Sequence, residues 1–136
     1  MILKEFIKET QKNQMISTLI KHYGVNSVRM KYKSIKDHAY FDYEKGILQL
    51  STRYKNIKDS QVKEFLVTLI HEIRHAMDAK TFGWKKFKEM YEMEMNLQVT
   101  NGKDPYKDNK FEKEAVEFGE KMWKHWKSKF KKEGLL

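Results

Sequence analysis

VKEFLVTLIHEIRHAM, residues 62–77, is the most strongly periodic stretch of this 136-residue chain. Its apolar residues recur at spacings of three and four, which is the period of one face of an α-helix. The pattern continues from about residue 60 to residue 80 and predicts a long amphipathic helix. His71 and His75 lie on a second, polar face of this helix, roughly opposite the apolar stripe.

The segment His71-Glu72-Ile73-Arg74-His75 has the H-E-x-x-H spacing of zinc peptidases. Residues four apart on a helix lie one above the other, so both imidazoles can reach one ion. The carboxylate of Glu72 is turned about 100° away and can reach a water molecule at that ion. The motif therefore predicts that His71 and His75 bind Zn²⁺ and that Glu72 is a general base. A chance match on an exposed helix is the alternative, and the strong periodicity of this helix favours a site.

Further elements on both sides of this helix predict an α+β fold. Alternation of apolar and polar residues predicts strands, and Glu44-Lys45-Gly46 predicts the tight turn of a hairpin. The expected strands are residues 27–33, 39–43 and 47–51, and the expected helices are residues up to 23, 60–80, 84–97 and 111–131. We expect a small three-stranded antiparallel sheet, with residues 47–51 at an edge, packed against the central helix. The N-terminal and C-terminal helices complete one domain spanning residues 1–136.

The last predicted helix offers a third metal ligand. Glu112 lies inside the apolar arc of that helix, where a carboxylate is costly unless it is paired or bound to a metal. An acid at a helix start, favoured there by the helix dipole, is the alternative interpretation of Glu112. Glu114 points away from the arc and stays open as a second choice. The third His of the metzincin pattern is missing, because Asp78 and Thr81 occupy the diagnostic positions.

The motifs lie in three segments: Ile47–Ser51, Leu69–Ala76 and Phe111–Phe118. Together they resemble the gluzincin-type metallopeptidases of the ImmA/IrrE kind and their small phage-encoded relatives. The last helix of those families carries an acid-x-x-Ala pattern, which Glu112 and Ala115 match, so the resemblance also implies that Glu112 is a ligand. Four residues after the acid those families usually have Asp or Asn, where this chain has Val116. Before the second His they often have Gly, where this chain has Arg74. The resemblance implies a minimal zincin-like domain that hydrolyses peptide bonds, in some cases those of a repressor protein.

Three further residues or segments have predicted roles around this site. Asp78 is expected to accept the second N–H of His71, a common arrangement for a zinc-bound imidazole. Tyr106, in the loop before the last helix, is a candidate donor to the oxyanion. The strand Ile47–Ser51 is expected to hold an extended peptide by backbone pairing.

Composition excludes several other classes of protein. The chain has no Cys, which excludes disulfides, iron–sulfur clusters and Cys-based zinc ribbons. Its apolar runs are far shorter than the roughly 18 residues that span a bilayer. Charged residues interrupt the first residues, MILKEF, unlike a signal peptide. We therefore expect a cytoplasmic protein.

The formal net charge of +9 leaves other functions open. Lysines are densest in residues 121–132, on the side of the helix opposite its apolar positions, which predicts a solvated face. Two alternatives to hydrolysis remain: a nucleic-acid-binding protein that uses these lysines, and a metal-stabilised interaction module without turnover. The expected substrate is a protein or peptide, and a regulatory protein partner and the oligomeric state stay open.

Overall fold

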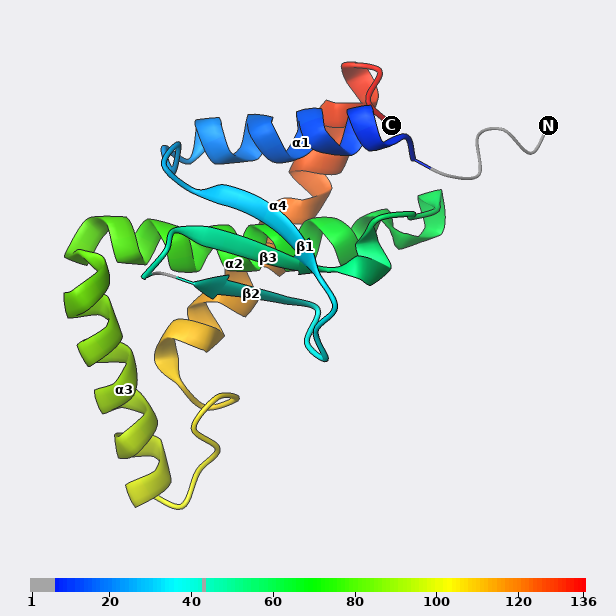
Figure 1. Ribbon diagram of the computed structural model, residues 1–136. Helices are drawn as coiled ribbons and strands as arrows, with labels where there is room; N and C mark the ends of the chain where they lie inside the picture. Colours follow the sequence, from blue (N-terminus) through cyan, green and yellow to red (C-terminus); the bar gives the residue numbers. More distant parts are fainter. Residues whose placement is uncertain (1–6, 43) are drawn as a thin grey trace.

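The computed structural model describes residues 7–42 and 44–136 (Figure 1). The described residues form α1 (Glu9–His22), β1 (Arg29–Lys33), β2 (Ala39–Asp42), β3 (Ile47–Ser51), α2 (Val62–Phe82), α3 (Trp84–Thr100) and α4 (Lys110–Lys132). Two short 3-10 turns, Thr52–Tyr54 and Asp59–Gln61, connect β3 to α2. The α+β class predicted from the sequence is confirmed. The predicted helical residues before Ile7, and Tyr43 of the predicted hairpin, lie outside the described residues.

The sheet is mixed, so the prediction of an antiparallel sheet was wrong. Its order is β1-β3-β2, in which β2 pairs with β3 antiparallel and β1 pairs with β3 parallel. The predicted hairpin is present, and Gly46 adopts the positive φ of 65° that its turn requires. Because β3 lies in the middle, Ile47–Ser51 is not an edge strand. The edge beside α2 is instead formed by β2.

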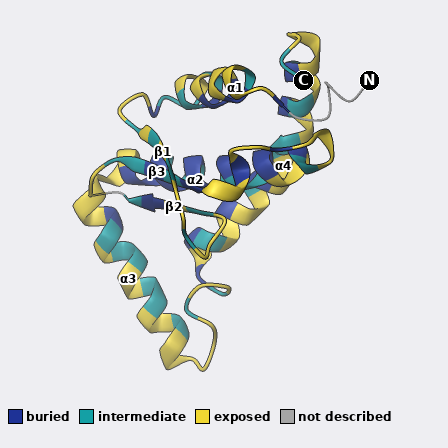
Figure 2. Cartoon of the chain, turned by 45° about the vertical axis from the view of Figure 1, so that its right-hand side comes forward, coloured by how far each residue is buried: buried dark blue, intermediate teal, exposed yellow. Residues whose placement is uncertain are grey.

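Helix α2 is the centre of the core, and Figure 2 shows its buried residues in dark blue. Its apolar stripe is inaccessible to solvent at Phe65, Leu66, Leu69 and Ile70. Helix α4 packs against α2 at Gly119, where a Cβ atom would lie only 2.9 Å from the carbonyl oxygen of Val67. Glycine therefore permits the close approach of the two helices that carry the predicted ligands.

A buried lysine joins α1 to the segment after β3. Lys12 is inaccessible to solvent, and its Nζ donates to the carbonyl oxygen of Tyr54 at 2.8 Å and to that of Lys55. Burial lowers the pKa of Lys12. At the other end of α1, Trp126 of α4 donates its indole N–H to the Tyr23 hydroxyl at 2.9 Å. These polar contacts attach α1 to the rest of the fold.

Helix α3 extends away from the core, with mostly exposed residues in Figure 2. Phe87 is its buried residue, near the end that joins α2. The turn between α2 and α3 contains Gly83, at a φ of 83°. Within the described part of the chain, no helix is both long enough and apolar enough to cross a membrane.

Candidate metal centre

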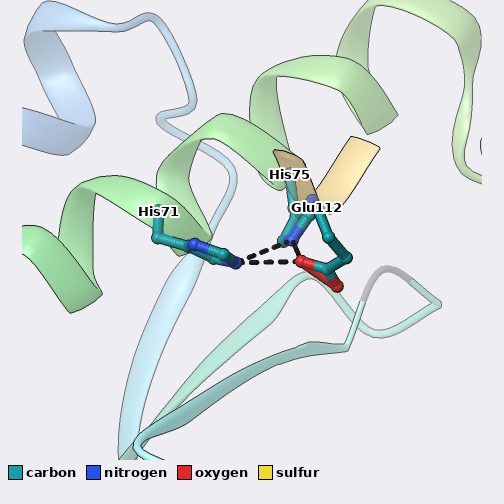
Figure 3. Close-up of side chains that lie close together, drawn as sticks. All are labelled: His71, His75 and Glu112. Atoms are coloured by element: carbon teal, nitrogen blue, oxygen red, sulfur yellow. Dashed lines mark hydrogen bonds and ion pairs between the residues drawn. The ribbon is translucent and has the colours of Figure 1, made fainter. Parts of the chain in front are cut away.

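Three predicted ligands converge between α2 and α4 (Figure 3). Oε1 of Glu112 lies 2.7 Å from Nε2 of His75 and 3.0 Å from Nε2 of His71. The two Nε2 atoms lie 3.2 Å apart. Donor atoms from two successive turns of α2 and from the first turn of α4 therefore lie close enough together to bind one cation.

This donor set fits a zinc ion. Tetrahedral Zn²⁺ has bonds of about 2.0–2.1 Å to nitrogen or oxygen, which places neighbouring ligand atoms roughly 3.3 Å apart. The three donor atoms are already close to that separation, so a cation needs only small side-chain movements to enter. Two imidazoles and one carboxylate also match the ligand set of catalytic sites that keep a position for water.

Of the two acids considered on α4, the structure brings only Glu112 to the histidines. The Glu114 carboxylate lies 3.7 Å from Nη2 of Arg74, and half of its side chain is exposed. The two residues are separated by about 200° around α4, so only one of them can face α2 at this point. The structure thus places Glu112, and not Glu114, beside the histidines, and its role as a metal ligand stays a prediction.

The predicted general base lies beside this cluster. Glu72 is 8% exposed, and its Oε1 is 3.9 Å from Nε2 of His71. Burial raises the pKa of Glu72, His75 and His71 oppose this rise, and the negative charge of Glu112 adds to it. Glu72 is consequently a stronger base than an exposed glutamate, which suits a group that takes a proton from water.

Glu112 and His75 also stabilise each other's charges without a metal. Burial disfavours the ionised form of Glu112, but hydrogen bonds from His71, His75 and Tyr91 hold its pKa well below the usual range. Burial alone would lower the pKa of His75, and the hydrogen bond to Glu112 together with nearby acids raises it overall. Without a metal, the ionised carboxylate of Glu112 and the protonated form of the His75 imidazole therefore favour each other.

Tyr91 of α3 is a site residue that the sequence reasoning missed. Its hydroxyl donates to Oε2 of Glu112 at 2.6 Å, which orients the carboxylate and leaves Oε1 facing the histidines. The Tyr91 ring stacks on Phe111 at 6.2 Å, and Phe87 packs edge-on against Phe111 at 5.3 Å. Val116, four residues after Glu112 on the same helix, is 50% exposed, and its aliphatic side chain gives the carboxylate no hydrogen bond. Tyr91 supplies the hydrogen bond from another helix.

Asp78 does not lie where the sequence placed it. Its Oδ1 is 3.5 Å from Nε of Arg74, one turn earlier on α2, and its charge contributes to the raised pKa of His75. Arg74 also lies over the Phe118 ring, 5.5 Å from its centroid. Arg74 thus links α2 to α4 through Glu114 and the Phe118 ring.

A cavity of about 700 Å³ opens onto the candidate ligands. The edge strand β2 contributes Ala39, Tyr40 and Phe41 to its wall, and α3 contributes Tyr91. Tyr106 also lines the cavity and is 60% exposed, so its role as an oxyanion donor stays a prediction. The cavity therefore leads to the cluster along β2.

Comparisons of the chain with family models, with curated proteins and with solved structures find no match. The assignment of the site therefore depends on the geometry and chemistry of the residues themselves.

Proposed function

We propose that this protein is a zinc-dependent peptidase of the zincin type, with His71, His75 and Glu112 as ligands. The proposal is carried by one observation: two imidazole nitrogens and one carboxylate oxygen from two helices meet beside a buried glutamate. The resemblance of the motifs to gluzincins of the ImmA/IrrE kind supports the same reading. A peptide or protein is the substrate class that this mechanism serves.

A zinc ion at this position would supply Lewis acidity and lower the pKa of a water molecule. Glu72 then takes the proton of the attacking water and passes it to the leaving amine. Tyr91 keeps Glu112 oriented through its 2.6 Å hydrogen bond. These steps need no covalent intermediate on the protein, which agrees with a chain that contains no Cys.

Strand β2 replaces Ile47–Ser51 as the expected peptide-binding edge. It lies at the border of the sheet, pairs on one side only with β3, and lines the cavity. An extended substrate is expected to add to this strand by backbone hydrogen bonds. The scissile bond would then lie between β2 and the α2 ligands.

Metal analysis tests the ligand set. We expect about one zinc per chain in the wild type and in Glu114→Ala, and strongly reduced zinc in His75→Ala and Glu112→Ala. Glu114→Ala is a matched control because it removes a carboxylate from the same turn of α4. Full zinc content in the Glu112→Ala variant would reject the site.

Hydrolysis tests the chemistry. A mixture of peptides, analysed by mass spectrometry, should be cleaved by the zinc-loaded wild type. Glu72→Gln keeps the shape and the ligands but removes the base, and should slow cleavage by about 10²–10⁴. Equal rates for the two proteins would remove Glu72 from the mechanism.

A further inference from the structure

The cavity at the candidate ligands continues beyond them along α2. A hollow of about 170 Å³ shares Ala39, His71 and Glu72 with it. A second hollow, of about 360 Å³, shares three lining residues with the 170 Å³ hollow: His38, Val67 and Thr68. The three adjoining hollows, together called the groove below, follow the polar face of α2 from Glu64 to His75. At 1.5 Å per helical residue this is roughly 16 Å, enough for about five residues of extended peptide.

The charges along this groove have the opposite sign to the chain as a whole. The chain has 28 Lys and Arg against 19 Asp and Glu. Among the described residues that line the groove, Lys63 is the only Lys or Arg. Its acidic lining residues are Asp37, Glu64, Glu72, Glu92, Glu112 and Glu120. A basic protein therefore presents an acidic groove at the place where its substrate would lie.

These acids have different partners. Glu112 belongs to the ligand cluster, and Glu72 lies beside it as the base. Glu64 accepts a hydrogen bond from the buried Tyr54 hydroxyl at 2.9 Å. Asp37 and Glu92 are exposed, stand on different walls of the main cavity, and form no ion pair with another described residue. They are thus the two acids best placed to meet a charge on the substrate.

Two further observations agree with a negative field in the main cavity. Burial raises the pKa of Tyr40 in the cavity wall, the charges of Asp42, Glu44 and Glu72 add to the rise, and Lys88 opposes it. The rings of Tyr40 and Tyr106 are half or more exposed and also attract cations through their π faces.

We propose that this groove selects a peptide segment with Lys or Arg beside the scissile bond, through Asp37 and Glu92. This inference rests on the proposed peptidase function and adds its substrate class. Because the net charge of the protein repels basic peptides at long range, a preference for them must come from groups close to the bound segment.

The test uses the zinc-loaded full chain and two otherwise identical peptides, one with Lys and one with Gln beside the cleavable bond. For the wild type we expect kcat/KM to be about tenfold higher with Lys. In Asp37→Asn/Glu92→Gln the ratio should fall to within about twofold. The matched control, Glu89→Gln/Glu117→Gln, removes the same charge from exposed positions outside the groove and should keep the wild-type ratio.

Binding separates this inference from the proposed function. Fluorescence anisotropy with the zinc-loaded Glu72→Gln protein measures the affinity for the same two peptides without turnover. Preferential binding of the Lys peptide that is lost on changing Asp37 and Glu92 supports the inference even if no peptide is cleaved. Cleavage without a Lys preference would overturn the inference and leave the peptidase standing. Absence of binding, or a preference that the groove variant retains, would also overturn it.

Discussion

The hydrogen bond from Tyr91 to Glu112 gives a sharp prediction about metal affinity. Tyr91→Phe removes one hydroxyl and keeps the ring that stacks on Phe111 at 6.2 Å. The lost bond is short, at 2.6 Å, and its acceptor is ionised. A hydrogen bond to a charged group contributes about 1.5–3 kcal/mol, and partners of ligand residues typically change metal affinity by about 10–100-fold. We expect the zinc affinity of Tyr91→Phe to be about 10–100-fold lower than that of the wild type.

The assay is competition for zinc between the protein and a chromophoric chelator at fixed pH. Tyr106→Phe is the matched control, since Tyr106 lines the same cavity but makes no hydrogen bond to Glu112. Thermal unfolding of both metal-free variants checks that the fold is intact. We expect the affinity of Tyr106→Phe to match that of the wild type.

An unchanged affinity in Tyr91→Phe would refute the reasoning in a specific way. It would mean that water replaces the hydroxyl at Glu112 Oε2 without loss, and that packing between α3 and α4 alone orients the carboxylate. An equal loss in both tyrosine variants would instead indicate a general effect of cavity polarity. Only a selective loss supports Tyr91 as the residue that positions Glu112.

Three other substitutions or conditions have defined outcomes. Gly119→Ala should lower the free energy of unfolding by about 1–3 kcal/mol in urea titrations, because the new Cβ meets the Val67 carbonyl at 2.9 Å; a more stable variant would contradict the close packing. Lys12→Ala should destabilise the protein by about 2–4 kcal/mol, measured in the same way, because the buried carbonyl group of Tyr54 and the partly buried one of Lys55 lose their donor; a loss below 1 kcal/mol would contradict this role. In the metal-free protein, the lowered pKa of Glu112 stabilises the fold above about pH 4.5, and this contribution is lost as the pH falls. The raised pKa of His75 stabilises the fold below about pH 6.5, and this contribution is lost as the pH rises. Unfolding in EDTA should therefore show greatest stability between these values, with a flatter profile in Glu112→Gln.

Helix positions could be predicted from the sequence because they depend on local periodicity. The predicted helix at residues 60–80 is α2 at Val62–Phe82, and the predicted helix at 111–131 is α4 at Lys110–Lys132. The β2–β3 hairpin was also predictable, since a short turn with Gly46 joins its strands. The place of β1 in the sheet was not predictable from the sequence. Its parallel pairing with β3 joins segments that are separated by two connections, and it depends on packing across the whole sheet.

The candidate ligands were predictable for a similar reason. His71 and His75 share a helix face, and Glu112 lies within an apolar stripe, so each could be found from the period of one helix. Tyr91 could not be found in this way. Its contact with Glu112 depends on the direction of α3, which is set by the turn at Gly83, where φ is 83°. Its spacing of four from Phe87 placed it on the inner face of α3, but no local signal gave it a partner.

The candidate metal centre and the apolar core use opposite faces of α2. The apolar face of this helix is fully buried at Leu69 and Ile70, and its polar face is also largely covered, with Glu72 8% and His75 7% exposed. Burial of the Glu72 carboxylate is unfavourable mainly because of desolvation, and repulsion from Glu112 adds to the cost, as the raised pKa of Glu72 indicates. A divalent ion held by Glu112 and the histidines would offset this repulsion, so zinc binding should stabilise the fold as well as enable chemistry. Replacing Glu72 by Gln removes the repulsion while keeping the ligands. The metal-free Glu72→Gln protein should therefore be more stable than the metal-free wild type, and it should gain less stability from zinc.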